Sequence, residues 1–333
     1  MPNKKAACEI ILGTVFALLG ALLHAENANS QSQNASYPSH TIQIVMPLQA
    51  GSGVDLLLRP IAQKMSESLG QAITIENIPG GAGIIGATKV AQANPDGYTL
   101  GAFNDSILTM LPNLYKKVDY DPIQSFIPVS EVAAITFVMV ANPNFPGNSA
   151  ADLIRIAKEN PGKIDYASGG NGSPQHIGME IFRQYTGAPL VHIPYRGAAA
   201  AVTDVMAGQV PVMISALSVV LPHIRAGKLK VLGITSKNRS PLLPNSPTVN
   251  ESVKGYDFST WGAIVLPKGT SSTIVSRLNE ALAISLKDTK LRDQLIQQGF
   301  EFATLGPDHL KEMTVQGLVK MKKVIKDGGI QPD

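Results

Sequence analysis

Glycine-rich turns at residues 49–55, 79–86 and 168–176 carry groups that could bind an anion. Each turn follows a short apolar stretch and precedes an amphipathic one, which is the pattern of a strand that leads into a helix. Glycines let the backbone approach a ligand closely, and the free N–H groups at a helix N-terminus favour negative charge. We therefore predict that these turns bind an anionic ligand.

The first turn contains an acidic residue, Asp55, whose role has two interpretations. Ser52 can cap the following helix, and Asp55, three residues later, can complete a capping box. Alternatively, the turn contacts a ligand, although a carboxylate at the start of the helix repels an anion. Both interpretations remain open from the sequence.

The second turn contains a formal G-x-G-x-x-G motif, from Gly81 to Gly86, which is typical of dinucleotide-binding sites. Residues 77–79 stand between the expected strand and the glycines, and no acidic residue ends a second strand about 20 residues later. We therefore reject a dinucleotide site and expect no cofactor.

The third turn ends in Ser173 and Pro174, residue types that prefer the N-cap and the first position of a helix. Its hydroxyls and backbone N–H groups could hold a carboxylate. A hydrolase that uses Ser173 or Ser168 with a histidine is an alternative, although G-x-S-x-G is absent. His176 fits either a packing role or a ligand contact.

Arg196, in the segment Pro194-Tyr195-Arg196-Gly197, is the best-placed cation for a carboxylate. Its planar guanidinium can bind both carboxylate oxygens at once. An ion pair with an aspartate is the alternative role for Arg196. The histidines show no metal-ligand spacing, so we expect no metal site.

Short apolar stretches alternate with amphipathic ones from Tyr37 onward, which predicts a repeated strand–helix–strand order. We expect strands at residues 42–46, 73–76, 99–103, 132–140, 164–167, 191–193, 210–215, 230–235 and 260–266, and helices between them and in the C-terminal tail. This order is typical of an α/β fold with mainly parallel sheets flanked by helices.

Two clusters of proline, glycine and polar residues, at 142–147 and 236–255, indicate a division into two lobes. We predict that residues 37–141 and 256–333 form lobe 1 and that residues 142–255 form an inserted lobe 2. Ligands of such folds bind in the crevice outside the carboxyl ends of the strands. Trp261, the single tryptophan, either reports lobe closure from beside the second crossover or packs in the core of lobe 1.

Composition and the N-terminus exclude several classes of protein. The 333 residues are 44% hydrophobic and carry a net charge of +3 with few aromatic residues, which argues against disorder and nucleic-acid binding. One cysteine cannot form an internal disulfide. Lys4 and Lys5, an apolar run at residues 10–23 and small residues up to Ala25 predict a signal peptide over residues 1–25, with an uncleaved anchor as the alternative.

Segments spread along the chain resemble one known family, the Bug-type receptors, which are the extracytoplasmic solute-binding proteins of tripartite tricarboxylate transporters. The matching segments are residues 44–47, 51–55, 77–83, 94–100, 166–169, 173–176, 191–197, 222–228, 243–248 and 261–263. Two positions depart from the family pattern. Ser52 separates Gly51 from Gly53, and Pro211 stands where the family often has an acidic residue, so Pro211 receives no role.

The resemblance implies a two-lobed fold of the periplasmic-binding-protein (Venus flytrap) type that closes on an organic acid without catalysis. The acid would be a di- or tricarboxylate or an aromatic carboxylate. The family's ligand-binding positions correspond here to Gln49, Gly51, Ser52, Gly53, Asp55, Asn77, Pro79, Gly80, Asn104, Asp105, Ser106, Ser168, Gly169, Asn171, Ser173, His176, Tyr195, Arg196 and Gly197.

The resemblance further implies partners and a location. We expect a periplasmic monomer that delivers its ligand to the membrane permease subunits of a tripartite transporter, with no nucleic-acid partner. The alternatives are an exported α/β hydrolase and a periplasmic sensor subunit that serves a signalling partner.

Overall fold

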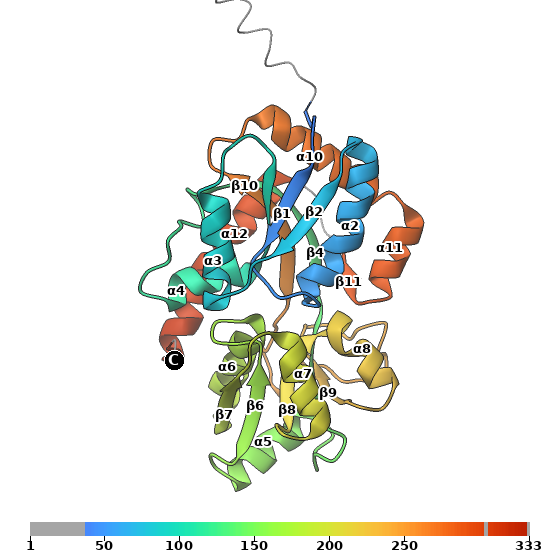
Figure 1. The fold of residues 1–333 in the computed structure, drawn as a ribbon. Helices are drawn as coiled ribbons and strands as arrows, with labels where there is room; N and C mark the ends of the chain where they lie inside the picture. Colours follow the sequence, from blue (N-terminus) through green and yellow to red (C-terminus); the bar gives the residue numbers. More distant parts are fainter. Residues whose placement is uncertain (1–36, 303–305, 332–333) are drawn as a thin grey trace, which may run out of the picture. The chain divides into compact units, whose positions relative to one another are not determined.

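A computed structural model describes residues 37–302 and 306–331. The signal peptide predicted over residues 1–25 lies outside the described residues. The unit His40–Asp333 is compact and contains two β-sheets flanked by helices (Figure 1). Within the described ranges, no helix combines the length and the apolar character needed to cross a membrane.

The two sheets have six and five strands. In spatial order, the first sheet consists of β11 (Phe300–Glu301), β4 (Phe126–Ile135), β10 (Thr260–Pro267), β3 (Thr99–Asn104), β1 (Ile42–Met46) and β2 (Ile73–Asn77). The second sheet consists of β7 (Leu190–Pro194), β6 (Ile164–Ser168), β8 (Val212–Ala216), β5 (Phe137–Ala141) and β9 (Lys230–Ile234).

Most strands of each sheet run in one direction, as expected, although both sheets also contain antiparallel pairs. β1 pairs in parallel with β2 and β3, whereas β10 is antiparallel to both β3 and β4, and β11 is antiparallel to β4. In the second sheet β6 makes parallel pairs with β7 and β8, and β5 makes antiparallel pairs with β8 and β9. The antiparallel pairs involve β4, β5 and β10, which connect the sheets and are not constrained by a strand–helix–strand crossover within one sheet.

The prediction of a single strand at residues 132–140 is wrong. β4 ends at Ile135 and β5 begins at Phe137, so the chain passes from the first sheet to the second at Thr136. The apolar run continues across this point without a turn signal, which is why the sequence pattern does not show the change of sheet. The chain returns to the first sheet between β9 and β10, and the lobe boundaries expected from the sequence remain a proposal.

Helices follow most strands, and several begin at a serine whose hydroxyl accepts a backbone N–H. Ser52, Ser149, Ser173 and Ser271 are such N-caps. The helical segments of the first half are α2 (Gly53–Leu69), the 3₁₀ turn η2 (Gly81–Gly83), α3 (Ile84–Ala91), the π-helical turn η3 (Ser106–Met110), α4 (Leu111–Leu114) and α5 (Ala150–Glu159). Those of the second half are α6 (Pro174–Thr186), α7 (Ala198–Ala207), α8 (Leu217–Arg225), α9 (Val249–Ser252), α10 (Ser272–Ser285), α11 (Thr289–Ile296) and α12 (Pro307–Asp327).

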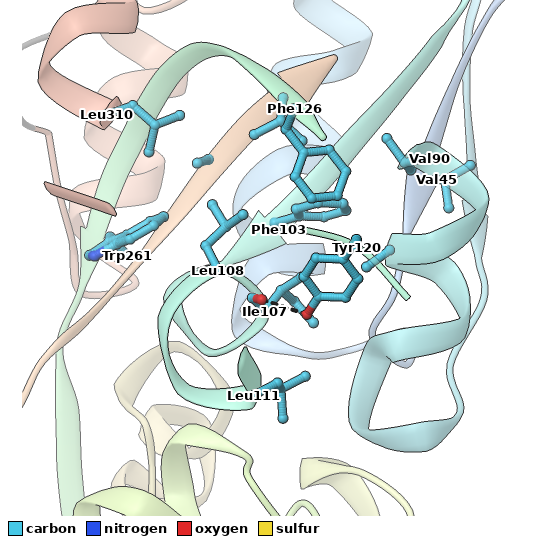
Figure 2. Packing of buried hydrophobic residues seen from close by; sticks show 13 residues of the cluster. Val45, Val90, Phe103, Ile107, Leu108, Leu111, Tyr120, Phe126, Trp261 and Leu310 are labelled. Carbon is cyan, nitrogen blue, oxygen red and sulfur yellow. Dashed lines mark hydrogen bonds between the residues drawn. The ribbon is translucent and has the colours of Figure 1, made fainter. Parts of the chain in front are cut away.

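An aromatic cluster fills the core beside the first sheet (Figure 2). Phe103 and Phe126 pack edge to face with ring centroids 5.1 Å apart. The buried hydroxyl of Tyr120 donates a hydrogen bond to the carbonyl oxygen of Ile107 at 2.6 Å. Trp261 belongs to this cluster and is 9% exposed, which supports its role as a core residue.

Candidate functional site

A cavity of about 580 Å³ is lined by segments that follow strands of both sheets. Most predicted ligand-binding residues line it, namely Gln49, Ser52, Gly53, Pro79, Gly80, Asn104, Ser106, Gly169, Asn171, Ser173, Tyr195, Arg196 and Gly197. The remaining predicted residues are outside the lining, namely Gly51, Asp55, Asn77, Asp105, Ser168 and His176. The cavity is therefore the candidate binding site.

Five of the described α-helices begin at this cavity. Gly53 of α2, Pro174 of α6 and Ala198 of α7 line it, and so do the α3 N-cap residue Gly83 and the α8 N-cap residue Ala216. The N–H groups of a first helical turn have no intrahelical acceptor and carry a partial positive charge. The cavity wall therefore presents several backbone groups that attract an anion.

Arg196 is the single charged side chain in the lining, counted over the residues that the structure describes. Its side chain is exposed and forms no ion pair with any described residue. The alternative role of Arg196 in an ion pair with an aspartate therefore has no support. The guanidinium is available to a ligand carboxylate.

Asp55 stabilises the first loop but does not line the cavity. Its carboxylate accepts the backbone N–H of Gly51 at 3.0 Å and the side-chain amide of Asn77 at 3.2 Å, and it pairs with the Arg59 guanidinium at 2.5 Å. Burial opposes the charge, but these donors together lower the pKa of Asp55. The Ser52 cap is confirmed, because its hydroxyl accepts the N–H of Asp55 at 3.3 Å, but the capping box does not form, since the Asp55 carboxylate accepts the N–H of Gly51 and not that of Ser52.

The second loop approaches the cavity through backbone in the left-handed region. Gly80, Gly81, Ala82 and Gly83 have φ angles of 129°, 53°, 57° and 108°. A Cβ atom on Gly83 would lie 2.4 Å from the Ile107 side chain and 3.3 Å from the Pro47 carbonyl oxygen. The left-handed backbone conformation therefore favours glycine at position 83, and a side chain there would also require Ile107 to move.

His176 lies behind the third loop. Ser173 caps α6 by accepting the N–H of His176 at 3.3 Å, as predicted. The His176 imidazole is 5% exposed, and its Nδ1 atom accepts the N–H of Gly172 at 3.1 Å. The packing interpretation of His176 is therefore the one that the structure supports.

Ser168 and His192 come together, which supplies the serine–histidine pair that the hydrolase alternative requires, although the sequence did not indicate which histidine would be the partner. The Ser168 hydroxyl and His192 Nε2 are 2.6 Å apart, a separation that a serine nucleophile and its base also have. However, Ser168 is fully buried, accepts the backbone N–H of Gly170 at 3.0 Å and does not line the cavity. This pair therefore organises the loop and does not face a substrate.

Tyr195 and Asn171 line the cavity next to Arg196 and Ser173. Burial and a hydrogen bond to the Asp204 carboxylate raise the pKa of Tyr195 to about 12, so its hydroxyl remains neutral at physiological pH. The side-chain oxygen of Asn171 is buried and has no hydrogen-bond partner in the protein. A ligand group that donates a hydrogen bond would satisfy it.

Asp105 is buried away from the cavity. The residue is 5% exposed, and its Oδ1 atom has no hydrogen-bond partner in the protein. Burial raises the pKa of Asp105 to about 8. Asp105 therefore carries a proton at neutral pH and does not contribute a charge to the site.

Several lining residues were not predicted, among them Tyr115, Phe137, Gln175, Ala216 and Thr260. Ala216 stands at a strand-to-helix junction, so the signal that marked the glycine-rich turns could have found it. Tyr115, Phe137 and Thr260 reach the cavity only through the tertiary fold. Among the described residues, no group of three or more His, Cys, Asp or Glu side chains could hold a metal ion.

Comparisons with known proteins relate this chain to one family. Residues 57–330 match the family described as "Tripartite tricarboxylate transporter family receptor". Protein BugT of Bordetella pertussis is 30% identical over 317 residues, which cover 95% of this chain and 97% of BugT.

Two similar solved structures contain ligands. A protein of R. palustris solved with adipate is 31% identical, with a TM-score of 0.86, and the match covers 90% of this chain and 100% of that one. MatC of Rhodopseudomonas palustris, solved with bound malate, is 27% identical, with a TM-score of 0.83, and the match covers 87% and 100%.

The fold class expected from the sequence is thus confirmed: this is the two-lobed α/β fold of periplasmic binding proteins. The family consists of receptors and not of enzymes, which removes the hydrolase alternative. The chain belongs to the receptor family of the tripartite tricarboxylate transporters and is a periplasmic solute-binding protein.

Proposed function

We propose that this protein captures a small organic carboxylate in the 580 Å³ cavity and delivers it to the membrane permease subunits of a tripartite transporter. The ligand is a di- or tricarboxylate or an aromatic carboxylate. The observation that carries the proposal is the meeting of five helix N-termini and the Arg196 guanidinium at one cavity. The adipate and malate in two relatives support the same class of ligand.

The physical basis of binding is that the cavity wall attracts a negatively charged ligand and has no carboxylate of its own in its lining to repel it. Asp55, the acidic residue nearest to the first loop, is already neutralised by Arg59. A ligand carboxylate would replace its hydration shell with backbone N–H groups and the Arg196 guanidinium, which are held in place before binding. Binding that is stronger in the closed arrangement of the lobes then drives closure.

A thermal-shift screen followed by calorimetry tests this function. Adipate, malate, citrate and benzoate are compared with adipamide, which has the length of adipate but no charge. A binding carboxylate at 100 times its dissociation constant should stabilise the protein by about 2.7 kcal/mol. A rise in melting temperature with adipamide and with none of the acids would contradict the proposal.

Arg196→Gln and Arg196→Lys test the cationic contact. We expect Gln to weaken carboxylate binding by roughly 10- to 100-fold, because charge-assisted hydrogen bonds contribute about 1.5–3 kcal/mol. Lys should restore part of the affinity, since it keeps the charge but not the planar fork. Equal affinity in all three proteins would exclude Arg196 from the contact.

The partner and the oligomeric state belong to the same proposal. We propose a monomer, exported by a signal peptide over residues 1–25, that docks on permease subunits. Light scattering on the mature protein and N-terminal sequencing of the exported chain test the first two points. Retention of the ligand-loaded protein on immobilised permease tests docking, and retention on a sensor kinase instead would favour the signalling alternative.

A further inference from the structure

We infer that His176 is a positioning residue. Its imidazole and the Ser106 hydroxyl both hydrogen-bond to the backbone of Gly172, and these two contacts form what we call the joint between the two sheets. The joint requires a neutral His176 imidazole. This inference concerns the control of the cavity and rests on the proposed function. His176 touches the ligand loop from behind and does not line the cavity.

The contact of His176 with Gly172 defines a protonation state. The backbone N–H of Gly172 can only donate, so the Nδ1 atom that it contacts at 3.1 Å must be the unprotonated nitrogen. Gly172 stands directly before Ser173, the cap of α6 and a lining residue. The imidazole therefore fixes the backbone that presents Ser173 and Asn171 to the cavity.

Ser106 makes the second contact of the joint. Its hydroxyl donates to the carbonyl oxygen of Gly172 at 2.7 Å, and Ser106 is 2% exposed. Ser106 stands two residues after the end of β3 in the first sheet, whereas Gly172 follows β6 in the second. This buried hydrogen bond consequently ties the two sheets together at the cavity.

Space around Gly172 reinforces the joint. The residue has φ +76°, and a Cβ atom there would lie 2.6 Å from the Leu111 side chain and 2.9 Å from that of Leu114. Both leucines belong to α4, which follows Ser106 along the chain. Gly172 is thus packed against two apolar side chains of the chain segment that follows β3 of the first sheet.

The groups around His176 include other titratable residues. Its ring stacks on the His192 ring at 4.1 Å with an interplanar angle of 8°, and Tyr166 stacks on His192 from 4.9 Å. The Tyr166 hydroxyl donates to Glu180, whose carboxylate is paired with Arg183 at 2.7 Å. The negative charge of Glu180 is therefore already compensated by Arg183.

Protonation of His176 at Nδ1 would break the joint. Two N–H donors would then face each other at a buried position, and Gly172 would lose its acceptor. The loop would loosen, so ligand affinity should be lower at any pH at which His176 carries a proton than at a pH at which it is neutral.

Three variants and one control test this role in the full mature chain. His176→Ala removes the acceptor, His176→Asn keeps an oxygen acceptor of similar reach, and Ser106→Ala removes the contact from the first sheet. His223→Asn is the matched control, because His223 lies on α8 outside this cluster. Affinity for adipate and for malate is measured by calorimetry at pH 8 and pH 6.

We expect His176→Ala to bind about ten- to a hundredfold more weakly at pH 8, because it leaves a buried N–H unpaired. His176→Asn should bind nearly as well as the unchanged protein and should lose the decrease in affinity between pH 8 and pH 6. His223→Asn should keep both the affinity and the pH dependence. A His176→Asn protein with unchanged pH dependence would overturn the inference.

A ligand-free measurement separates this inference from the proposed function. Amide hydrogen exchange over residues 168–176 should become faster in His176→Ala and Ser106→Ala, and should remain slow in His176→Asn and His223→Asn. If neither acid binds the unchanged protein but exchange follows this order, the proposed ligand class fails and the joint stands. Equal exchange in all the proteins refutes the joint, whatever binds.

Discussion

At the scale of single residues, Asp55 shows how a carboxylate can stabilise a loop that is built for anions. It neutralises Arg59 and holds the N–H of Gly51 and the amide of Asn77, so it offers little negative charge to the cavity. The repulsion that argued against an acidic residue at this helix start is thereby removed. Arg59, Gly51 and Asn77 all donate to the oxygens of the one buried Asp55 carboxylate.

Asp55→Asn should destabilise the protein in a pH-dependent way. The pKa of Asp55 is lowered in the folded state, so its contribution is present above the ordinary value of 3.8 and is lost as the pH falls through the lowered pKa. We expect a loss of about 1.5–3 kcal/mol at pH 7, measured by urea unfolding, and a smaller loss once the pH is below the lowered pKa of Asp55. Glu280→Gln, which breaks an exposed pair with Arg277, is the control and should change little.

Asp105 should show the opposite pH dependence. Its pKa is raised to about 8, so the folded state binds a proton that the unfolded chain releases near pH 4. Stability should therefore fall as the pH rises from about 4 to 8, by at most about 1.4 kcal/mol per pH unit. Asp105→Asn should remove this slope, and urea unfolding at pH 5 and pH 8 measures it. An identical slope in the variant would show that another group titrates.

At the scale of elements, the N-terminus of α6 combines a structural and a binding role in one hydroxyl. Ser173 caps the helix and also lines the cavity. Ser149 caps α5 in the same way but lies outside the lining. The two serines therefore allow the cap and the ligand contact to be measured separately.

Ser173→Ala should cost about 0.5–2 kcal/mol of unfolding free energy, the usual effect of losing an N-cap. If the hydroxyl also holds the carboxylate, ligand affinity should fall in addition. Ser149→Ala should lose similar stability and keep its affinity, which calorimetry on both variants checks. Unchanged affinity in a folded Ser173→Ala protein would leave this serine with the capping role alone.

At the scale of the whole molecule, ligand binding should be visible as closure of the lobes. We expect the radius of gyration measured by small-angle X-ray scattering to fall when a carboxylate saturates the protein. Trp261 should keep its emission spectrum in the same titration, because it packs in the aromatic core and is 9% exposed (Figure 2). No fall in the radius at saturation would count against a closing mechanism.

Much of the fold follows from local patterns in the sequence. The strands at Ile42–Met46 and Thr260–Pro267 are apolar runs between turn signals, and α6 begins at Ser173, which the sequence marks as an N-cap before Pro174. Strand–helix junctions at glycine-rich turns also indicated most of the cavity lining. These features depend on neighbouring residues, so composition and spacing are sufficient to predict them.

Other features depend on which segments meet in space. The sequence did not predict the antiparallel pairs of β10, the change of sheet at Thr136 or the approach of Tyr115 and Thr260 to the cavity. Strand direction is set by chain connections across the whole molecule, because a strand that returns from another sheet can pair in either direction.

The sequence by itself determined the family, the fold class and the loops that surround the cavity. Only the tertiary structure showed that Asp55 and His176 stand behind those loops, and that Ser106 reaches Gly172 across 66 positions of the chain. The physical reason is that hydrogen-bond partners are set by distance in space, and residue spacing predicts that distance only within a helix, a strand or a turn.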